Sequence, residues 1–398
     1  MALGWLILDI LDIVLFVVVA FTTIYITIFS IAGLFSKRSN TPTAQRQNRF
    51  IILIPAHKQD DTVEETVKSI LGQTYPQHYF DVTVISNNQK EMTNFRLAQY
   101  PITLLPTNFD NNIKAQSLQI AINNLPQFKI YDIVIVLDAS SLVEPKFLEQ
   151  MNNAFEAAGT KAIQTHRMPK NRDTAIANLD AIFDEINNSI FRRGHINIGL
   201  SAATSGSGTA YEYKWLANNI KNLKTAIDDK DIESLLLRQK IFIDYFDDIH
   251  VYDEKKRATQ DFNEQRGHWI SSQFHSILSN IKYLPGAFIN KRYDLADKII
   301  QWMLVPRTIM VGIIVVMSLI LPFIYLSLAI KWWILFAFVM FILALAVPDY
   351  LVDKNWDKSF MKAPFIIIGS LFNITKIFSR KRLISIIIIY VLDNNTYR

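Results

Sequence analysis

The sequence predicts an α/β domain with a mostly parallel sheet, about three transmembrane helices and further amphipathic helices at the membrane surface. Two observations predict this architecture. Short apolar runs alternate with stretches of helical periodicity between residues 50 and 165. Uncharged runs of 17 to 24 residues lie toward both ends of the chain, and the longer ones can cross a hydrocarbon layer of about 30 Å.

The composition excludes several classes of protein. The chain has 398 residues and no cysteine, which excludes disulfides, cysteine-ligated zinc, iron–sulfur clusters and thiol catalysis. Half of the residues are hydrophobic and only 19% are charged, so a disordered or purely soluble chain is disfavoured. Glycine is scarce, with 12 residues, and neither GxGxxG nor GxxxxGK[ST] occurs. This argues against P-loop NTPases and dinucleotide-binding oxidoreductases.

Three uncharged runs predict transmembrane helices. Ile13–Ser36 follows two aspartates rather than a basic segment, so it is interpreted as a retained span and not as a signal peptide. Thr308–Ile330 is the second run. Trp332–Pro348 is the third, and it opens after Lys331 with a tryptophan pair expected at the membrane interface. The short connection predicts that the last two spans form a hairpin with Lys331 at its tip.

Basic residues set the predicted orientation. They follow the first span and precede the second: Lys37, Arg38, Arg46, Arg49, Lys291, Arg292, Lys298 and Arg307. The positive-inside rule then places the N-terminus outside and residues 39–303 in the cytoplasm. The chain is therefore predicted to be a multi-pass protein of a cell membrane, and its composition, rich in Ile, Asn and Lys, leans toward a bacterial inner membrane.

Five regions follow from these spans. They are the first transmembrane helix (1–38), a cytoplasmic domain (39–282), an interfacial helical segment (283–303), the transmembrane hairpin (304–352) and a cytoplasmic-side interfacial tail (353–398). Two apolar runs in the tail, Ala363–Thr375 and Leu383–Leu392, are short for a span and are separated by basic residues. An interfacial helix on anionic headgroups is favoured there, with a re-entrant or spanning segment as the alternative.

The cytoplasmic domain shows strands and helices in alternation. The expected strands are Phe50–Pro55, Phe80–Ile85, Ile133–Leu137 and Ala162–Thr165. The expected helices are Asp61–Leu71 (with Asp61 or Thr62 as N-cap), Asn112–Ala121 and Glu144–Phe155. Because ligands bind beyond the carboxyl ends of strands in such sheets, the segments to inspect are His57–Asp61, Ser86–Asn88 and Asp138–Ser140.

From His166 onward the strand pattern fades. Ala175–Arg193 has an amphipathic helical pattern, Asp228–Gln239 opens acidic and continues as a helix, and Tyr283–Trp302 is interpreted as a membrane-surface helix. Ser201–Ala210 (SAATSGSGTA) holds two glycines within three positions. Close approach of its backbone to a ligand and a plain flexible loop both fit that pattern.

Seven motifs now stand in a characteristic order: IPAHKQD, VISNN, KAQSL, VLDAS, SGSGTAY, DDKDIE and QRGHW. In this order, and within this membrane frame, the chain resembles a membrane-bound family-2 glycosyltransferase with a GT-A (Rossmann-like) fold, the group of cellulose, chitin and hyaluronan synthases. The resemblance covers roughly Phe50–Gln273 together with one preceding and two following spans. It implies inverting transfer of a sugar from a nucleotide sugar, usually a UDP-sugar.

The resemblance assigns roles to single residues. It implies that Asp229 deprotonates the acceptor hydroxyl and that Asp138 holds the nucleotide and a Mg²⁺ or Mn²⁺ ion. It places Pro55, Ala56, His57, Asn87, Lys114 and Ser140 at the nucleotide sugar, and Gly206, Gly208, Gln265, Arg266, His268 and Trp269 at the acceptor, with Trp269 stacked on a sugar ring. The residues alone leave blander readings open: an acidic helix start at 228–233, a turn cap at Asp138, a solvated Lys114 and an interfacial Trp269.

The chain departs from the family pattern at defined positions. Ser140 replaces the second Asp of DxD, Asn87 replaces the Asp expected to pair with uracil, and His268 replaces the Arg of QxxRW. Asp228 replaces a Glu, and Ala115 replaces a Gly after Lys114. Ser140 has the greatest weight, because a hydroxyl is a poor substitute for a carboxylate ligand of Mg²⁺ or Mn²⁺.

Three functions follow. The first is a glycosyltransferase at the cytoplasmic membrane face that adds a sugar to a polysaccharide or lipid-linked acceptor. The second is a catalytically degenerate relative that acts as a membrane scaffold or regulatory subunit. The third is a metal-independent transferase with a different donor. The implied partners are a nucleotide sugar, the acceptor, membrane lipids and, as an open possibility, a second membrane subunit, without nucleic acid.

Overall fold

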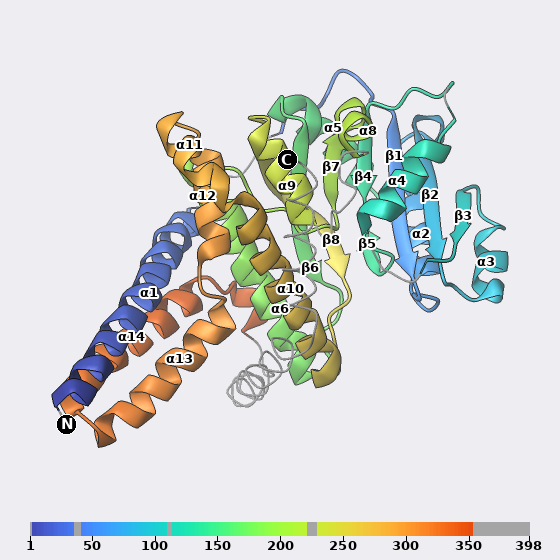
Figure 1. Ribbon diagram of the computed structural model, residues 1–398. Helices are drawn as coiled ribbons and strands as arrows, with labels where there is room; N and C mark the ends of the chain where they lie inside the picture. Colours follow the sequence, from blue (N-terminus) through green and yellow to red (C-terminus); the bar gives the residue numbers. More distant parts are fainter. Residues whose placement is uncertain (1, 36–40, 110–113, 127, 221–228, 353–398) are drawn as a thin grey trace, which may run out of the picture.

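The computed structural model describes residues 2–35, 41–109, 114–126, 128–220 and 229–352. Within them an eight-stranded sheet forms one end of the molecule, and a group of long helices projects from the other end (Figure 1). The predicted tail helices, Asp228, Lys37 and Arg38 lie outside the described residues. The α/β class predicted from the alternation of apolar runs is confirmed, and the sheet is mixed with a mostly parallel half.

The strands lie in the order β3-β2-β1-β4-β7-β6-β8-β5. They are β1 Phe50–His57, β2 Phe80–Asn87, β3 Thr103–Thr107, β4 Ile133–Val136, β5 Ser141–Val143, β6 Ala162–Pro169, β7 Thr209–Glu212 and β8 Ile243–Asp253. The pairs β1–β2, β1–β4, β2–β3 and β6–β8 are parallel. Strand β7 runs antiparallel between β4 and β6, and β5 runs antiparallel to β8.

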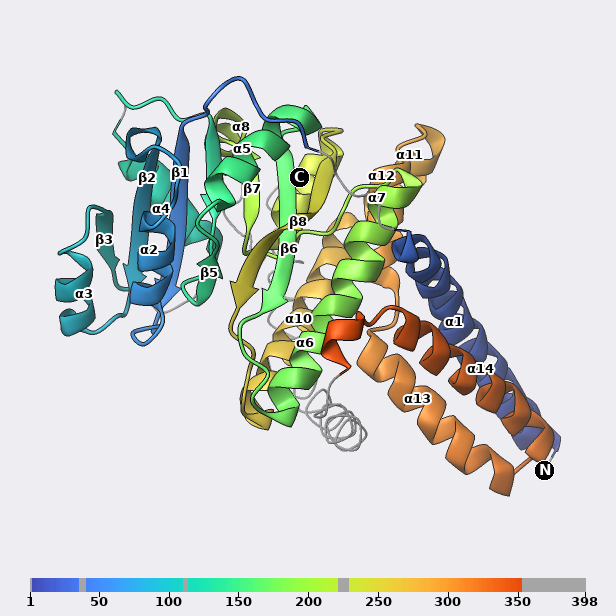
Figure 2. The same ribbon diagram turned by 180° about the vertical axis from the view of Figure 1, so that it is seen from behind.

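Helices cover both faces of the sheet (Figures 1 and 2). They are α2 Val63–Leu71, α3 Glu91–Leu97, α4 Lys114–Asn124, α5 Phe147–Ala158, α6 Ala175–Asn187, α7 His195–Ile198, α8 Tyr213–Asn219, α9 Asp229–Arg238 and α10 Thr259–Asn280. A π-helix, Asn188–Gly194, joins α6 to α7. The short helix α11 Leu284–Ile289 and α12 Tyr293–Met303 then lead to the apolar helices α13 Arg307–Ile320 and α14 Leu326–Leu345. The third apolar helix, α1 Ala2–Leu34, precedes the sheet in the chain.

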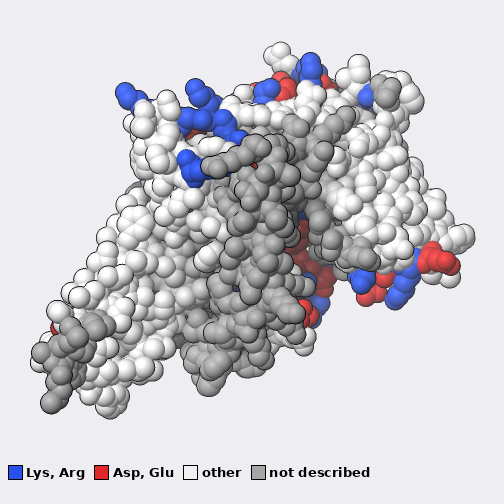
Figure 3. Space-filling view, viewed as in Figure 1, with Lys and Arg blue, Asp and Glu red and all other residues white. Residues whose placement is uncertain are grey.

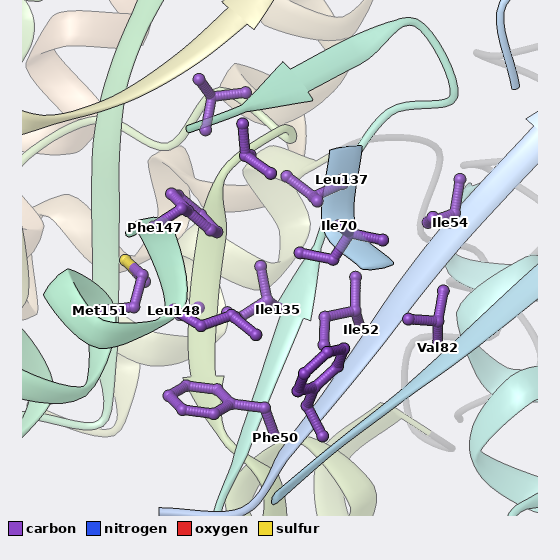
Figure 4. Close-up of a cluster of buried hydrophobic side chains, with 14 of the residues drawn as sticks. Phe50, Ile52, Ile54, Ile70, Val82, Ile135, Leu137, Phe147, Leu148 and Met151 are labelled. Carbon is purple, nitrogen blue, oxygen red and sulfur yellow. The ribbon is translucent and has the colours of Figure 1, made fainter. Parts of the chain in front are cut away.

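Strand β1 shows how the apolar runs build the core. Its residues alternate between two buried clusters, because successive side chains of a strand point to opposite faces. Phe50, Ile52 and Ile54 pack with α2 and α5 in the cluster of Figure 4. Ile51 and Leu53 pack with residues of α4, α8, α9 and α12 on the other face. The run is apolar throughout because both faces of this strand are covered.

The expectation that strands end near His166 is wrong. Strand β6 continues to Pro169, and β7 and β8 follow later in the chain. These strands were missed because their sequences mix charged and apolar residues. In β8, for example, Asp247 and Asp253 are paired with cations rather than exposed to water. Strands β3 and β5 and helices α3 and α10 were not predicted either.

The long apolar helices differ from the predicted spans in their boundaries. Among the described residues, two helices are long and apolar enough to cross a membrane, Leu8–Leu34 within α1 and α14. The run Thr308–Ile330 is not one helix, because α13 ends at Ile320 and a 3₁₀ turn, Leu321–Phe323, separates it from α14. This turn carries Pro322, which cannot donate to a continuing helix. Helices α12 and α13 form a pair bent by 48°, which counts as a third span if it crosses as one unit.

The prediction that Lys331 lies at the tip of the hairpin is wrong. It lies inside α14 and pairs with Asp12 of α1, whose other carboxylate oxygen accepts a hydrogen bond of 2.8 Å from Trp332 Nε1. Trp332 is fully buried, so only Trp333 of the expected interfacial pair is exposed. A charged pair costs less free energy between two apolar helices than either charge alone, and it fixes their register.

The long apolar helices are packed directly on the sheet domain. Helix α1 crosses the π-helix at two glycines, one from each partner. A Cβ on Gly33 would lie 2.6 Å from the carbonyl oxygen of Ser189, and one on Gly194 would collide with that of Phe29. Small residues allow such close backbone contact between helices. In Figures 1 and 2, α6 and α10 lie between the sheet and these apolar helices.

Candidate active site

The carboxyl ends of β1, β2 and β4 meet at one edge of the sheet, where ligands bind in open α/β sheets. His57 ends β1 opposite Asn87, which ends β2, and their side chains form a hydrogen bond of 2.9 Å. Asp138 follows β4. Pro55 and Ala56 precede His57, and of these Ala56 is buried. The sequence-predicted nucleotide residues of the three strands therefore share this edge.

Lys114 joins the two predicted acidic residues of the site. It is the first described residue of α4, and its Nζ lies 2.8 Å from Asp138 Oδ1 and 3.7 Å from Asp229 Oδ1. Desolvation alone would lower the pKa of Lys114, but the charges of Asp138 and Asp229 outweigh it and raise this pKa. Lys114 is therefore a fixed cation between two carboxylates and not a solvated helix lysine.

Gly206 lies against this trio. Its φ of +82° lies in the left-handed region, and a Cβ there would lie 2.7 Å from Lys114 Nζ and overlap the carboxylate of Asp229. Gly208 also has a positive φ, +68°, and a Cβ there would lie 2.7 Å from a methyl group of Val251. Glycine is needed at both positions for conformation and for space. For the segment Ser201–Ala210, this favours a backbone that lies close to neighbouring groups over a plain flexible loop.

A chain of hydrogen bonds holds the Asp138 loop from behind. The Asp138 backbone N–H donates to Ser207 Oγ (3.0 Å), Ser207 Oγ lies 2.7 Å from Ser141 Oγ, and Ser141 donates to Asp253 (2.9 Å). Asp253 in turn pairs with Arg167. Desolvation would raise the pKa of Asp253, but the charges of Arg167 and Lys255 lower it.

Sequence reasoning missed this support. Asp253, Arg167, Asp184 and Lys255 form one buried ionic cluster behind the site, with Lys255 and Asp184 in direct contact. No local pattern predicts it, because its members lie on β6, α6, β8 and the segment after β8. The one available signal was a charged residue in an otherwise strand-like segment, which indicates a buried partner.

Asn87 is engaged by the protein itself. Its Oδ1 accepts from the backbone N–H of Phe109 (3.1 Å), and its Nδ2 donates to the Phe109 carbonyl (3.2 Å) and to His57 Nδ1. Because Asn87 Nδ2 is the donor of this bond, His57 accepts it at Nδ1. Desolvation, followed by the charge of Lys58, lowers the pKa of His57, which favours the neutral ring that can accept. Asn87 thus orders the segment at Phe109 as well as lying at the nucleotide edge.

The QRGHW motif lies on α10, and its residues differ in burial because they lie on different faces of the helix. Arg266 is buried, donates to Asp180 at 3.2 Å, and has its guanidinium 4.7 Å from the ring centre of Trp269. Gln265 is partly buried, whereas His268 is exposed. One face of the Trp269 ring is thus in contact with Arg266. The arginine that reaches the interior is Arg266, two positions before the residue where the family motif has one.

A cavity of about 250 Å³ connects these elements. Asp229, Lys230 and Glu233 of α9 line it together with Arg266 and Trp269. Ile26 of α1 and the residues that lead into α13 also line it. Gln265, His268, Gly206 and Gly208 are outside this lining. The predicted base and the predicted acceptor tryptophan therefore line one cavity, which extends to the apolar helix α1.

The residues around Asp138 fit a divalent cation poorly. Asp138 is already paired with Lys114 at 2.8 Å, and Ser140 offers a hydroxyl in place of a carboxylate. No group of three His, Asp or Glu residues suited to a metal occurs among the described residues. Mg²⁺ is commonly held by one or two carboxylates together with substrate phosphates. Of these, the residues around Asp138 supply one carboxylate, that of Asp138 itself.

Comparison with known proteins identifies the family. Residues 47–272, more than half of the chain, match the family described as "Glycosyltransferase like family 2". The chain belongs to glycosyltransferase family 2. The matched segment contains all the motifs quoted above and extends from just before β1 into α10. No curated protein matches the chain by sequence.

Two solved structures illustrate the comparison by structure. The mannosyltransferase PcManGT from Pyrobaculum calidifontis, in complex with GDP-Man and Mn²⁺, has a TM-score of 0.53 at 12% identity, covering 85% of this chain and 97% of that one. S. aureus TarS 1-349 in complex with UDP-GlcNAc has a TM-score of 0.37 at 14% identity, covering 73% and 90%. At such low identity, the likeness to PcManGT shows that this family-2 chain has a GT-A-like fold.

Proposed function

We propose that this family-2 glycosyltransferase moves a sugar from a nucleotide sugar to a membrane-associated acceptor at the cytoplasmic face. The observation that carries the proposal is the convergence of Asp138 and Asp229 on Lys114 at the carboxyl edge of the sheet. PcManGT, which has a similar fold, is described in complex with GDP-Man, which supports a nucleotide-sugar donor. UDP- and GDP-sugars are both candidates for the donor.

Residues at the donor end of the site have proposed roles in binding the nucleotide and the diphosphate. His57 and Asn87 lie where the nucleotide enters, beside Pro55 and Ala56. Lys114 places a positive charge next to Asp138, where the diphosphate of a donor would come to lie. A fixed cation of this kind stabilises the negative charge that grows on a departing diphosphate. Ser140 would contribute a hydroxyl donor to the same phosphates.

The acceptor end is organised around Asp229. Its carboxylate is held between Gly206 and Lys114 and faces the cavity that Trp269 also lines. In the proposed step, an acceptor hydroxyl attacks the anomeric carbon, its proton passes to Asp229, and the nucleoside diphosphate leaves with the electron pair of the broken C–O bond. Attack from the face opposite the leaving group inverts the anomeric centre. Gln265, Gly208 and the exposed His268 remain proposed acceptor-side residues.

Two observations favour a second candidate, a catalytically degenerate membrane scaffold. Ser140 removes a carboxylate from DxD, and the amide of Asn87 is bonded to the backbone of Phe109. A nucleotide titration separates the two functions. The full chain in nanodiscs is titrated with UDP and with GDP by calorimetry, with and without Mn²⁺. Micromolar binding, about −8 kcal/mol, supports the transferase, whereas a folded protein that binds neither nucleotide supports the scaffold.

A further inference from the structure

The cavity beside Asp229 changes in character toward the membrane. The lining residues from α9 are polar, whereas α1 and the segment before α13 contribute the apolar Ile26, Leu304, Val305 and Pro306. Ile26 belongs to α1, which is one of the two helices long enough to span a membrane, and Pro306 directly precedes α13. Figure 3 shows that the described surface over α1 and α13 carries almost no charged side chain. A hydrocarbon chain at this end would therefore meet apolar surface.

Arg307 directly follows Pro306 and has no carboxylate partner among the described residues. Its Nη2 donates to the Asn187 side chain (2.6 Å) and, more weakly, toward the Phe183 carbonyl (3.4 Å). Its Nη1 is buried without a hydrogen-bond partner, and no carboxylate of the described residues lies within ion-pair distance. An unpaired guanidinium beside an apolar wall is costly, and such a group commonly has an anionic ligand.

The other charged side chains around the cavity do not balance the positive charge of Arg307. Among the described residues, five cationic side chains line the cavity against three acidic ones. Arg266 has one carboxylate partner, Asp180, and its Nε is buried without a hydrogen bond. The rings of Phe183 and Trp269 lie 4.2 and 4.7 Å from its guanidinium. Arg266 and Arg307 thus present N–H donors with the fork geometry that phosphate oxygens match.

We propose that the membrane end of this cavity binds the phosphate group of a lipid-linked acceptor, with Arg307 and Arg266 on the phosphate. The hydrocarbon chain leaves between α1 and α13, and the hydroxyl-bearing saccharide points toward Asp229. This inference rests on the proposed transferase function and specifies its acceptor class. A neutral, growing polysaccharide would leave Arg307 without a partner, and this favours the phosphate-bearing lipid.

Binding of simple phosphate probes tests the proposal without knowledge of the sugars. The full chain in zwitterionic nanodiscs is titrated with farnesyl phosphate, farnesol and inorganic phosphate, and the fluorescence of Trp269 and Trp302, which both line the cavity, reports occupancy. The variant is Arg307→Gln, which keeps a donor for Asn187 but removes the charge. The matched control is Arg193→Gln, because Arg193 is paired with Asp247 and lies outside the cavity lining.

Farnesyl phosphate is expected to bind the parent chain at least tenfold more tightly than farnesol or inorganic phosphate. Arg307→Gln is expected to weaken it at least tenfold, while Arg193→Gln changes it less than twofold. Equal binding of farnesol overturns the phosphate contact, equal binding of inorganic phosphate overturns the lipid, and unchanged binding by Arg307→Gln overturns the assigned residue. Nucleotide titration of the same samples is a separate readout: its failure counts against the transferase, not against the lipid site.

Discussion

Lys114 Nζ lies 2.8 Å from the carboxylate of Asp138. The two residues come from the start of α4 and the loop after β4, and the ion pair places a permanent positive charge where the family pattern expects a metal. The carboxylate of Asp229 lies 3.7 Å from the same Nζ. The donor half and the acceptor half of the proposed site are thus coupled through one ammonium group.

Replacing Lys114 tests that coupling. Lys114→Met keeps most of the side-chain volume and leaves Asp138 and Asp229 without their shared cation. We expect nucleotide affinity to fall at least tenfold, about 1.4 kcal/mol, since repulsion between carboxylates and diphosphate would no longer be offset. Calorimetry with UDP and GDP measures it. Lys114→Arg should recover part of the affinity, and an unchanged affinity in Lys114→Met would contradict the assignment.

Asp229→Asn tests the proposed base. The amide keeps the size of the side chain but cannot accept the proton of the acceptor, so turnover should fall by a factor of roughly 10²–10⁴. The melting temperature and nucleotide affinity should stay close to those of the parent. Product formation from a radiolabelled nucleotide sugar measures the effect. Full turnover in this variant would assign proton removal to another group.

Gly206→Ala should damage the site through one added methyl group. The backbone there has a positive φ, and the new Cβ would meet both Lys114 and Asp229. The matched control is Gly159→Ala, where φ is +60° but no atom lies within 4 Å of the new Cβ. Both variants should lose about 1–2 kcal/mol of stability from left-handed strain. Only Gly206→Ala should also lose turnover. Equal losses of turnover in the two variants would contradict the inference that the site needs the close contact of Gly206 with Lys114 and Asp229.

Ser140→Asp tests the poor fit to a metal. Restoring the second carboxylate of DxD should make nucleotide binding more dependent on Mn²⁺, because a second oxygen ligand favours the ion. Calorimetry with and without Mn²⁺ in parent and variant reports the difference. Activity that appears only in Ser140→Asp would favour the degenerate scaffold for the natural chain. An identical Mn²⁺ response in both proteins would show that Ser140 does not limit metal binding.

His166 makes the stability of the fold pH-dependent. It lies 2.8 Å from both Glu185 and Asp247, and although desolvation lowers its pKa, these carboxylates raise it to about 9. A raised folded-state pKa means that the stabilisation is complete below pH of about 6.5 and is lost as the pH rises through 9. Melting temperatures should therefore fall over this window. His166→Asn should flatten the profile, and a parent whose melting temperature is constant from pH 6.5 to 9 would contradict this charge state.

Periodicity and residue type determined much of this protein from the sequence alone. The strands β1, β2 and β4, the helices on them and the apolar ends were predictable, because burial on two faces leaves a continuous apolar run and membrane spans leave uncharged ones. Asp138, Lys114, Asp229 and the glycine loop were found through ordered motifs. Their chemical roles remain predictions of the family resemblance.

The tertiary structure alone decided which distant charges meet. Local patterns predict that a residue is buried or exposed but carry no information on its partner. Strand β8 and the Arg167–Asp253 pair therefore escaped prediction. Lys331 proved to pair with Asp12 between α14 and α1. Within the QRGHW motif, Arg266 lines the cavity and His268 does not. The unpaired Arg307 appears only once the chain is folded, because a missing partner is defined by everything that packs around it.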